Sequence, residues 1–403
     1  MDRLPPETMS NIVGHVRGDM VDHALTPLSL ICRRLQPIVE AKIYRDLSIS
    51  FSSSRRLSHK SLANILTPTR LSYIRELVVT FTRRNLRFPD NDIRQVFDLL
   101  TRVPHTPEPR LEVHFSFDFF ELASPSSVTA KSTPTDELPE LPMVRYCSLV
   151  NCDTADRLSP HALCYMASKM PRLRDLGVTI LGISPIHHRI ELARSLTDLP
   201  MSIHYFSLSI HQKDGVGGLL VMENGEDILT RQLRRFSQRE GLKRLIFSGG
   251  VEPSIFWPPH SAVSEPRRWP TLECFMLHLD NTQYLAGRHA AVSLDVPRDA
   301  DDPDGIYAPK GMINAFCQAL AKCSASMPKA TDNYISFNDI RHTTFKYDTT
   351  HPETPCVELG RNPSLELDED TLSEWRKTAE VHNLDFRMRI EGNWLYRDYF
   401  IIS

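Results

Sequence analysis

One spacing of apolar residues recurs along most of this chain of 403 residues. An apolar residue is followed, after two other residues, by a second apolar residue and, after one more, by a third. The copies are Ile74-Leu77-Val79, Val144-Cys147-Leu149, Leu173-Leu176-Val178, Ile203-Phe206-Leu208, Leu242-Leu245-Phe247 and Leu272-Phe275-Leu277. From Val144 to Leu272, successive copies start 29, 30, 39 and 30 residues apart. A period of this length is typical of a repeat that contains one strand and one helix.

Helical patterns fill the segments between the copies. Apolar residues recur at helical spacing in 92–103, 161–170, 189–199, 226–240 and 311–327. Leu111, Val113 and Phe115 form a further strand-like run, which brings the predicted strands to seven. Because strands alternate with helices and hairpin signals are weak, the predicted fold class is α/β, with a mostly parallel sheet and crossover helices.

The repeated spacing resembles leucine-rich repeats in an irregular form. Those repeats carry Asn or Cys three residues after the final apolar position, and here only Cys152 matches. Four of the other copies have Leu181, His211, Gly250 and Asp280 at that position. The resemblance implies a body of stacked strand–helix units with an extended binding surface. The alternative is a closed α/β sheet domain that happens to repeat one spacing, and both folds would present a binding surface.

Three segments interrupt the repeat and are expected to be loops. Residues 121–141 are rich in Ser, Thr and Pro, 251–270 surround Trp257, and 297–309 are rich in Asp. The first segment lacks the apolar residues needed to offset chain-ordering entropy, which predicts disorder. We expect Phe256 and Trp257 to be buried and to fasten the second loop. Residues 371–403 are expected to form a C-terminal helix and strand, with Trp375 in the core.

The first fifty residues contain three short helical patterns. Pro5 and Pro6 suit a first helical turn, and Thr26 with Pro27 gives a second start. Pro37 opens a third helix. Apolar residues at helical spacing are Met9, Ile12, Val13 and Val16 in the first helix, Leu28, Ile31, Cys32 and Leu35 in the second, and Ile38, Val39 and Ile43 in the third. Three such short helices cannot easily cover their own apolar faces, so a partner surface is expected.

Residues 1–45 resemble the F-box. The resemblance rests on Leu4-Pro5-Pro6-Glu7 and on the triplet Ile31-Cys32-Arg33, and the stretch 39–51 resembles fungal F-box proteins in particular. It implies a three-helix module that docks a Skp-family adaptor protein and, through that adaptor, a cullin scaffold. The implied docking residues are Leu4, Pro5, Ile12, Leu28, Ile31, Cys32 and Leu35. Residues 46–403 would then form the target-binding body. The alternative is an ordinary N-terminal helical subdomain.

Charge and cysteine spacing exclude several classes of protein. The net charge is −3, with basic residues in mild excess over 1–110 and acidic residues in excess beyond, too dispersed for a nucleic-acid footprint. The 8 cysteines are spaced singly, which predicts buried free thiols and neither disulfides nor a zinc site. The opening residues do not resemble a signal peptide, and no apolar run is long enough to span a membrane. We therefore expect an intracellular protein, cytoplasmic or nuclear.

Motifs for catalysis or cofactor binding are weak. Ser248-Gly249-Gly250 follows a predicted strand but is not a nucleophile elbow, and Gly215–Gly218 lacks the lysine of a phosphate-binding loop. His187-His188 with Glu191 is expected to be a polar helix surface, and the Asp299–Asp304 run lacks the closing glutamate of a calcium loop. We expect no catalytic residue, metal or cofactor.

The sequence therefore predicts a substrate-recognition subunit of a cullin-type ubiquitin ligase, which binds an unknown protein target and performs no chemistry itself. A second hypothesis is an interaction scaffold whose F-box docks the adaptor without ubiquitination. A third is an enzyme, which would require polar residues converging in a deep pocket.

Overall fold

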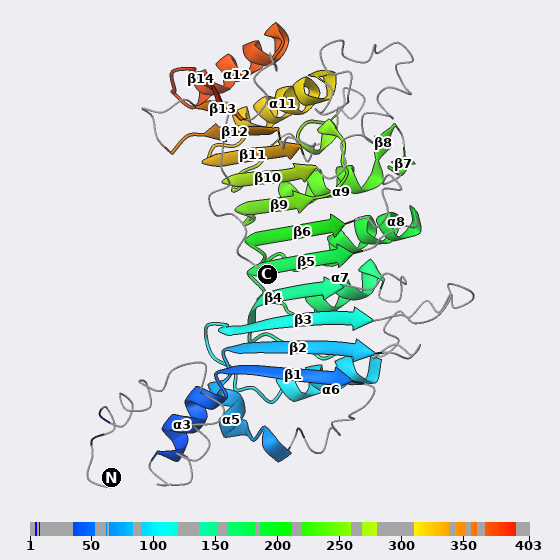
Figure 1. Cartoon of the computed structure of the whole chain (residues 1–403), viewed down its shortest axis with the longest axis vertical. Helices are drawn as coiled ribbons and strands as arrows, with labels where there is room; N and C mark the ends of the chain where they lie inside the picture. Colours follow the sequence, from blue (N-terminus) through cyan, green and yellow to red (C-terminus); the bar gives the residue numbers. More distant parts are fainter. Residues whose placement is uncertain are drawn as a thin grey trace. The chain divides into compact units, whose positions relative to one another are not determined.

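The computed structural model describes residues 5, 8, 35–52, 62, 64–83, 90–119, 137–151, 159–181, 186–211, 220–223, 225–258, 268–279, 310–337, 343–350, 356–360 and 367–391. The chain divides into two compact units, Met1–Leu176 and Gly177–Ser403. Both contain the predicted alternation of strands and helices (Figure 1).

The first unit is built on parallel strands that pair in chain order. These are β1 (Asp46–Ser52), β2 (Glu76–Arg83), β3 (Leu111–Phe119) and β4 (Val144–Asn151). Each is parallel to the next. The helices of this unit are α3 (Gln36–Ile43), α5 (Pro68–Tyr73), α6 (Asp90–Leu100) and α7 (Pro160–Ser168). The predicted parallel sheet is therefore confirmed here.

Buried residues alternate with more exposed residues along each strand. The sheet therefore has one buried face and one face that is more exposed, which we call the open face. In β2, Leu77, Val79 and Phe81 are buried, whereas Val78 and Thr80 are half-buried. On the buried face, the rings of Phe51, Phe81 and Phe117 stack across β1, β2 and β3, with neighbouring centroids 5.2 and 5.0 Å apart. Helix α6 covers this face, and its Phe97 stacks on Phe115 with centroids 6.1 Å apart.

The second unit continues the pattern and ends it with a reversal. The strands follow the order β5 (Asp175–Leu181, starting at the end of the first unit), β6 (Tyr205–His211), β9 (Arg244–Ser248), β10 (Cys274–Leu279), β11 (Asp332–Phe337), β12 (Thr344–Asp348), β13 (Val357–Gly360) and β14 (Met388–Glu391). The pairs from β6 to β11 are parallel. The β11–β12 and β12–β13 pairs are antiparallel, and β13–β14 is parallel.

Helices of the second unit pack on its sheet through aromatic contacts. They are α8 (Ile186–Ser195), α9 (Ile228–Ser237), α11 (Lys310–Ala325) and α12 (Glu369–Val381), with short 3-10 helices η2 (Leu196–Asp198) and η3 (Pro253–Ile255). A two-stranded ribbon, β7 (Met222–Glu223) and β8 (Glu226–Asp227), precedes α9. Phe236 of α9 contacts Phe206 of β6 at 4.7 Å, and Phe316 of α11 contacts Phe337 of β11 at 5.9 Å. Trp375 of α12 is buried, as predicted.

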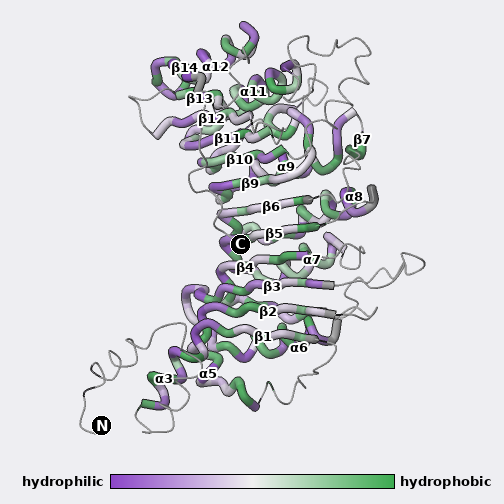
Figure 2. Tube along the Cα trace, in the orientation of Figure 1, coloured by the Kyte–Doolittle hydropathy of each residue, from purple (hydrophilic) through white to green (hydrophobic). Residues whose placement is uncertain are grey.

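Main-chain hydrogen bonds tie the starts of neighbouring strands together. The N–H of Arg75 donates to the carbonyl of Arg45 at 2.8 Å. In the second unit the N–H of Lys243 donates to His204 at 2.8 Å, and that of Glu273 donates to Lys243 at 2.7 Å. Hydrophilic residues gather at these strand starts (Figure 2). These main-chain bonds therefore fix the relative positions of polar residues on adjacent strands.

Most predicted elements are confirmed. The seven predicted strands correspond to β2, β3, β4, β5, β6, β9 and β10, and the predicted helices to α6, α7, α8, α9, α11 and α12. The third N-terminal helix is confirmed as α3, and the run around Leu47, Ile49 and Phe51 as β1. The first two N-terminal helices lie outside the described residues. The spacing did not predict β11, β12 or β13.

The described parts of the predicted loops contain no strand or α-helix, but they contain buried residues. Of 121–141, Leu138 and Leu141 are buried, so the expected disorder does not extend to this end of the segment. Of 251–270, Phe256 is buried as predicted, but Trp257 is only half-buried and stacks on the buried Trp269 at 6.4 Å. Trp269 is itself held in place by its Nε1, which donates to Ser237 Oγ at 2.7 Å. Residues 297–309 lie outside the described part of the chain.

Candidate functional site

The predicted docking residues fall mostly outside the described part of the chain. Leu4, Ile12, Leu28, Ile31 and Cys32 are among the undescribed residues. Pro5 is exposed. Leu35 is only 4% exposed. Docking by all of these residues remains a prediction.

Helix α3, the last helix of the predicted docking module, is fastened to the body of the first unit. Its Val39 is buried, as is Leu71 of α5. Arg70 of α5 donates to Glu40 Oε1 at 2.8 Å, and its guanidinium lies 5.1 Å from the ring centroid of Tyr44. The hydrogen bond from Arg70 lowers the pKa of Glu40 below its ordinary value. Helix α3 is thus held in place by both apolar and ionic contacts.

The open face of the first unit carries a cluster of polar and aromatic side chains. On adjacent strands, His114 Nε2 lies 3.6 Å from Glu76 Oε1, and the His114 ring lies 5.1 Å from the Tyr146 ring. Burial raises the pKa of Tyr146, so this phenol stays protonated at neutral pH. Ser116 donates to Asp118 at 3.2 Å on the same face. Such a surface offers hydrogen-bond donors, acceptors and ring faces to a partner.

The open face of the second unit has a similar character. The guanidinium of Arg244 lies 5.9 Å from the Tyr205 ring centroid, and His278 contacts Tyr334 at 5.5 Å. Lys346 donates to Asp348 at 2.8 Å and lies 4.0 Å from Asp332. Burial raises the pKa of Asp332. Tyrosine and arginine are enriched in protein interfaces, so this composition suits protein recognition.

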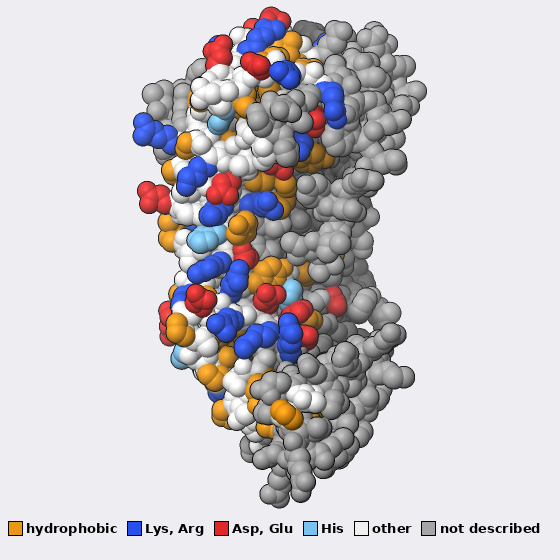
Figure 3. Space-filling model, turned by 90° about the vertical axis from the view of Figure 1, so that its left-hand side faces the viewer, with side chains coloured by type: hydrophobic (Ala, Val, Ile, Leu, Met, Phe, Trp, Pro, Cys, Tyr) orange, Lys and Arg blue, Asp and Glu red, His pale blue; other side chains and the backbone are white. Residues whose placement is uncertain are grey.

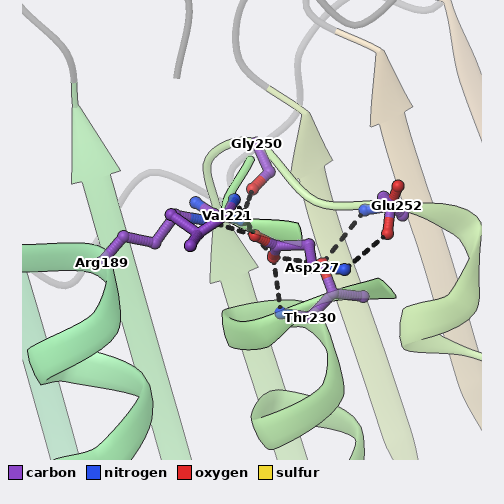
Figure 4. A network of polar contacts seen from close by, with 6 residues as sticks. All are labelled: Arg189, Val221, Asp227, Thr230, Gly250 and Glu252. Carbon is purple, nitrogen blue, oxygen red and sulfur yellow. Dashed lines mark hydrogen bonds and ion pairs between the residues drawn. The ribbon is translucent and has the colours of Figure 1, made fainter. Parts of the chain in front are cut away.

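A buried ion pair secures the segments that precede α9 (Figure 4). Arg189 of α8 donates two hydrogen bonds to the Asp227 carboxylate, at 2.8 and 2.6 Å, and a third to the Gly250 carbonyl at 2.7 Å. Asp227 also caps α9 by accepting from the Thr230 N–H at 2.8 Å and accepts from the Val221 N–H at 2.9 Å. The carboxylate therefore joins two helices and the strand ribbon before α9.

The electrostatics of this pair favour the ionised state. Burial alone would raise the pKa of Asp227, but the hydrogen bonds and charge of Arg189, together with the bonds from Thr230, lower it below its ordinary value. A second buried pair adjoins it, in which Arg234 of α9 donates to both carboxylate oxygens of Glu226 and to the Ser254 carbonyl. Together the two pairs connect α9 to α8, to the strand ribbon before it and to the segment around Ser254.

The sequence analysis did not predict this cluster, and it wrongly expected the neighbouring His188 to lie at the surface. His187, His188 and Glu191 were expected to form a polar helix surface, but His188 is 5% exposed because α8 packs against α9. Within the described residues, no group of three or more His, Cys, Asp or Glu side chains could hold a metal ion. The only sequence signal for the cluster is Asp227 preceding an apolar helical run, which is typical of an N-cap.

The predicted buried thiols are confirmed for the described cysteines. Cys147, Cys164, Cys274, Cys317, Cys323 and Cys356 are free and buried. Burial raises the pKa of Cys274 to about 12 and also raises that of Cys147, so both thiols stay protonated at neutral pH. Cys32 and Cys152 lie outside the described residues. None of the helices in the described segments combines the length and apolar character needed to cross a membrane.

Comparison with known proteins gives little further guidance. No protein-family model and no curated protein matches the sequence. Among solved structures, the leucine-rich repeat-containing protein LegL7 from Legionella pneumophila is similar, with 10% identity, a TM-score of 0.31, and coverage of 85% of this chain and 94% of that chain. A protein from Bacteroides fragilis has 9% identity, a TM-score of 0.27, and coverage of 62% and 72%. Neither similarity is close enough to support an argument about function.

Proposed function

We propose that the chain is a substrate-recognition subunit of a cullin-type ubiquitin ligase. Residues 1–45 would dock a Skp-family adaptor, and the open strand face would hold a protein target. The observation that carries the proposal is the junction of these two parts. Only Tyr44 and Arg45 separate α3 from β1, and the Glu40–Arg70 ion pair holds α3 against α5. The last helix of the docking module is therefore part of the same compact unit as the first strands of the open face.

The proposed mechanism is proximity. A target held on the open face would share one assembly with a ubiquitin-loaded conjugating enzyme, so their encounter would become effectively intramolecular. A short connection between docking helix and first strand favours this role, because flexible linkers lower the effective concentration of tethered partners. The recognition subunit itself then needs no catalytic residue.

The first test is binding of a purified Skp-family adaptor to the full chain. The double variant Leu4→Ala, Ile31→Asp removes one predicted apolar anchor and places a charge at another. We expect at least about a tenfold loss of affinity, since burying an unpaired carboxylate at an interface is costly. Met201→Asp is the matched control, because Met201 is 63% exposed in the second unit and is not a predicted docking residue. Circular dichroism would establish that all variants remain folded.

The outcomes separate the hypotheses. Failure of the intact chain to bind the adaptor would contradict the F-box proposal, and full binding by the double variant would contradict the docking residues. If the adaptor binds, the complex is assembled with cullin and a ubiquitin-loaded conjugating enzyme. Ubiquitin transfer to proteins that co-purify with the intact chain is the expected result. Adaptor binding without any transfer would favour the scaffold hypothesis instead.

A further inference from the structure

A hollow of about 280 Å³ lies in the first unit where α3, α5 and the starts of β1 and β2 meet. It is lined by Ala41, Arg45, Tyr73 and Arg75. Two of these side chains are guanidinium groups and one is a phenol, and none is a carboxylate. Its residues lie at the strand starts, and the face drawn in Figure 3 carries lysine and arginine side chains interspersed with acidic ones.

The two arginines are held close together by the main chain. The Arg45 carbonyl accepts hydrogen bonds from the N–H groups of Arg75 and Glu76, at 2.8 and 3.1 Å. Adjacent strands of a sheet lie about 4.8 Å apart, so two cationic side chains start from neighbouring positions. Like charges at this spacing repel one another unless an anion lies between them.

The protein itself provides little compensation for these charges. Arg45 Nε lies 3.8 Å from the Asp46 carboxylate, and both side chains are about two-thirds exposed, at 68% and 67%. Exposed pairs of this kind contribute little and rearrange easily. Arg75 donates to the Ile74 carbonyl at 3.4 Å, and no carboxylate of the described residues lies within ion-pair distance of it. Both guanidinium groups therefore retain donors for a ligand.

We propose that this hollow binds a tetrahedral oxyanion of the phosphoryl class. A dianion neutralises both arginines at once, and the guanidinium fork matches the oxygen spacing of a phosphate in bidentate fashion. Tyr73 also lines the hollow, and a tyrosine hydroxyl can act as a further donor to such an anion. The same chemistry fits a phosphorylated side chain of a protein and a free phosphate ion. This site does not depend on adaptor docking, so it stands or falls separately from the proposed function.

The test is isothermal titration calorimetry of the full chain in phosphate-free buffer at constant ionic strength. The probes are inorganic phosphate, sulfate, O-phosphoserine and O-phosphotyrosine, with acetate as the monoanionic comparison. The variants are Arg45→Gln and Arg75→Gln. The matched control is Arg110→Gln, an exposed arginine that directly precedes β3 but does not line the hollow. All three side chains are exposed, so each variant is expected to keep the melting temperature of the parent chain.

We expect one-to-one binding of the tetrahedral dianions, weakened at least about tenfold by Arg45→Gln and by Arg75→Gln, because each removes a charge-assisted hydrogen bond. Arg110→Gln should leave the affinity unchanged, and acetate should bind at least about tenfold more weakly. Tighter binding of the phosphoamino acids than of phosphate would identify a phosphorylated side chain as the source, and equal binding would identify the free ion. Absence of saturable binding, equal losses in all three variants, or acetate binding as tight as phosphate would overturn the proposal.

Discussion

Asp227 is a residue of the second unit on which many polar contacts converge. It has no exposed surface and pairs with Arg189, which is 8% exposed. We predict that Asp227→Asn lowers the free energy of unfolding by about 3–5 kcal/mol at neutral pH, because the substitution leaves a buried guanidinium without its counter-charge. Chemical denaturation followed by circular dichroism measures this loss.

The control for this prediction is Glu223→Gln, which removes the ion pair between Arg231 and Glu223 of the neighbouring strand ribbon. Glu223 is 53% exposed, so its loss should cost no more than about 1 kcal/mol.

The loss of stability caused by Asp227→Asn should also depend on pH. Since the fold lowers the pKa of Asp227, its stabilisation is present above the unfolded pKa of about 3.9 and is lost as pH falls through the lower folded value. A constant difference between parent and variant down to strongly acidic pH would contradict the assignment.

The sequence could predict only part of this residue's role. Asp227 stands directly before an apolar helical run, which is typical of an N-cap. Its ion pair with Arg189 joins residues 38 positions apart, and no local pattern encodes such a partner. The partner is determined by the way α8 and α9 pack, which depends on the whole repeat.

At the scale of elements, the stacked phenyl rings of β1, β2 and β3 give the sheet of the first unit its continuity. We predict that Phe81→Ala, in the middle of the stack, destabilises the first unit by about 3–5 kcal/mol, because it leaves a cavity between two flanking rings. Phe81→Leu keeps most of the volume and should cost clearly less. Thermal and chemical unfolding of both variants measure the difference, and equal losses would show that the stack is not the source of stability.

Strands of the repeat were predictable because each buries the same three positions against a crossover helix. Strands β12 and β13 were not, although Phe345 and Tyr347 are buried and alternate with half-buried residues. An antiparallel return needs no crossover helix, so the period of about thirty residues disappears where the sheet reverses. Likewise the sequence did not predict the hydrogen bond from Trp269 to Ser237, since it joins residues 32 positions apart.

At the scale of the molecule, the two compact units provide a test of how stability is distributed. In chains built from repeats, stability is approximately a sum of terms within repeats and between neighbours. We predict that Phe81→Ala increases hydrogen exchange mainly in β1 to β4, and that Asp227→Asn increases it mainly in β6 to β10. Exchange measured by mass spectrometry on peptic peptides locates each effect. A uniform increase across both units in either variant would contradict this expectation.

The sequence could predict which residues lie on the open face but not which of them contact one another. Alternation along the strands indicated which residues leave the core, yet the pairing of His114 with Glu76 and Tyr146 depends on strand register. Register between parallel strands is set by the lengths of the connections and by packing on the helices, neither of which a single strand specifies. The hollow at Arg45 and Arg75 was missed for the same reason, since its walls come from two helices and two strand starts.

The reversal at β12 also has an evolutionary consequence. A duplicated strand–helix unit can be accommodated between two parallel strands, where its hydrogen-bonding pattern matches both neighbours, and it would widen the open face by one strand spacing of about 4.8 Å. At the β11–β12 junction the strand direction reverses, so β12 and β13 are not copies of the parallel strand–helix unit. We therefore expect gain and loss of whole units in relatives to occur among the parallel strands up to β11, with the antiparallel strands kept as a terminal module.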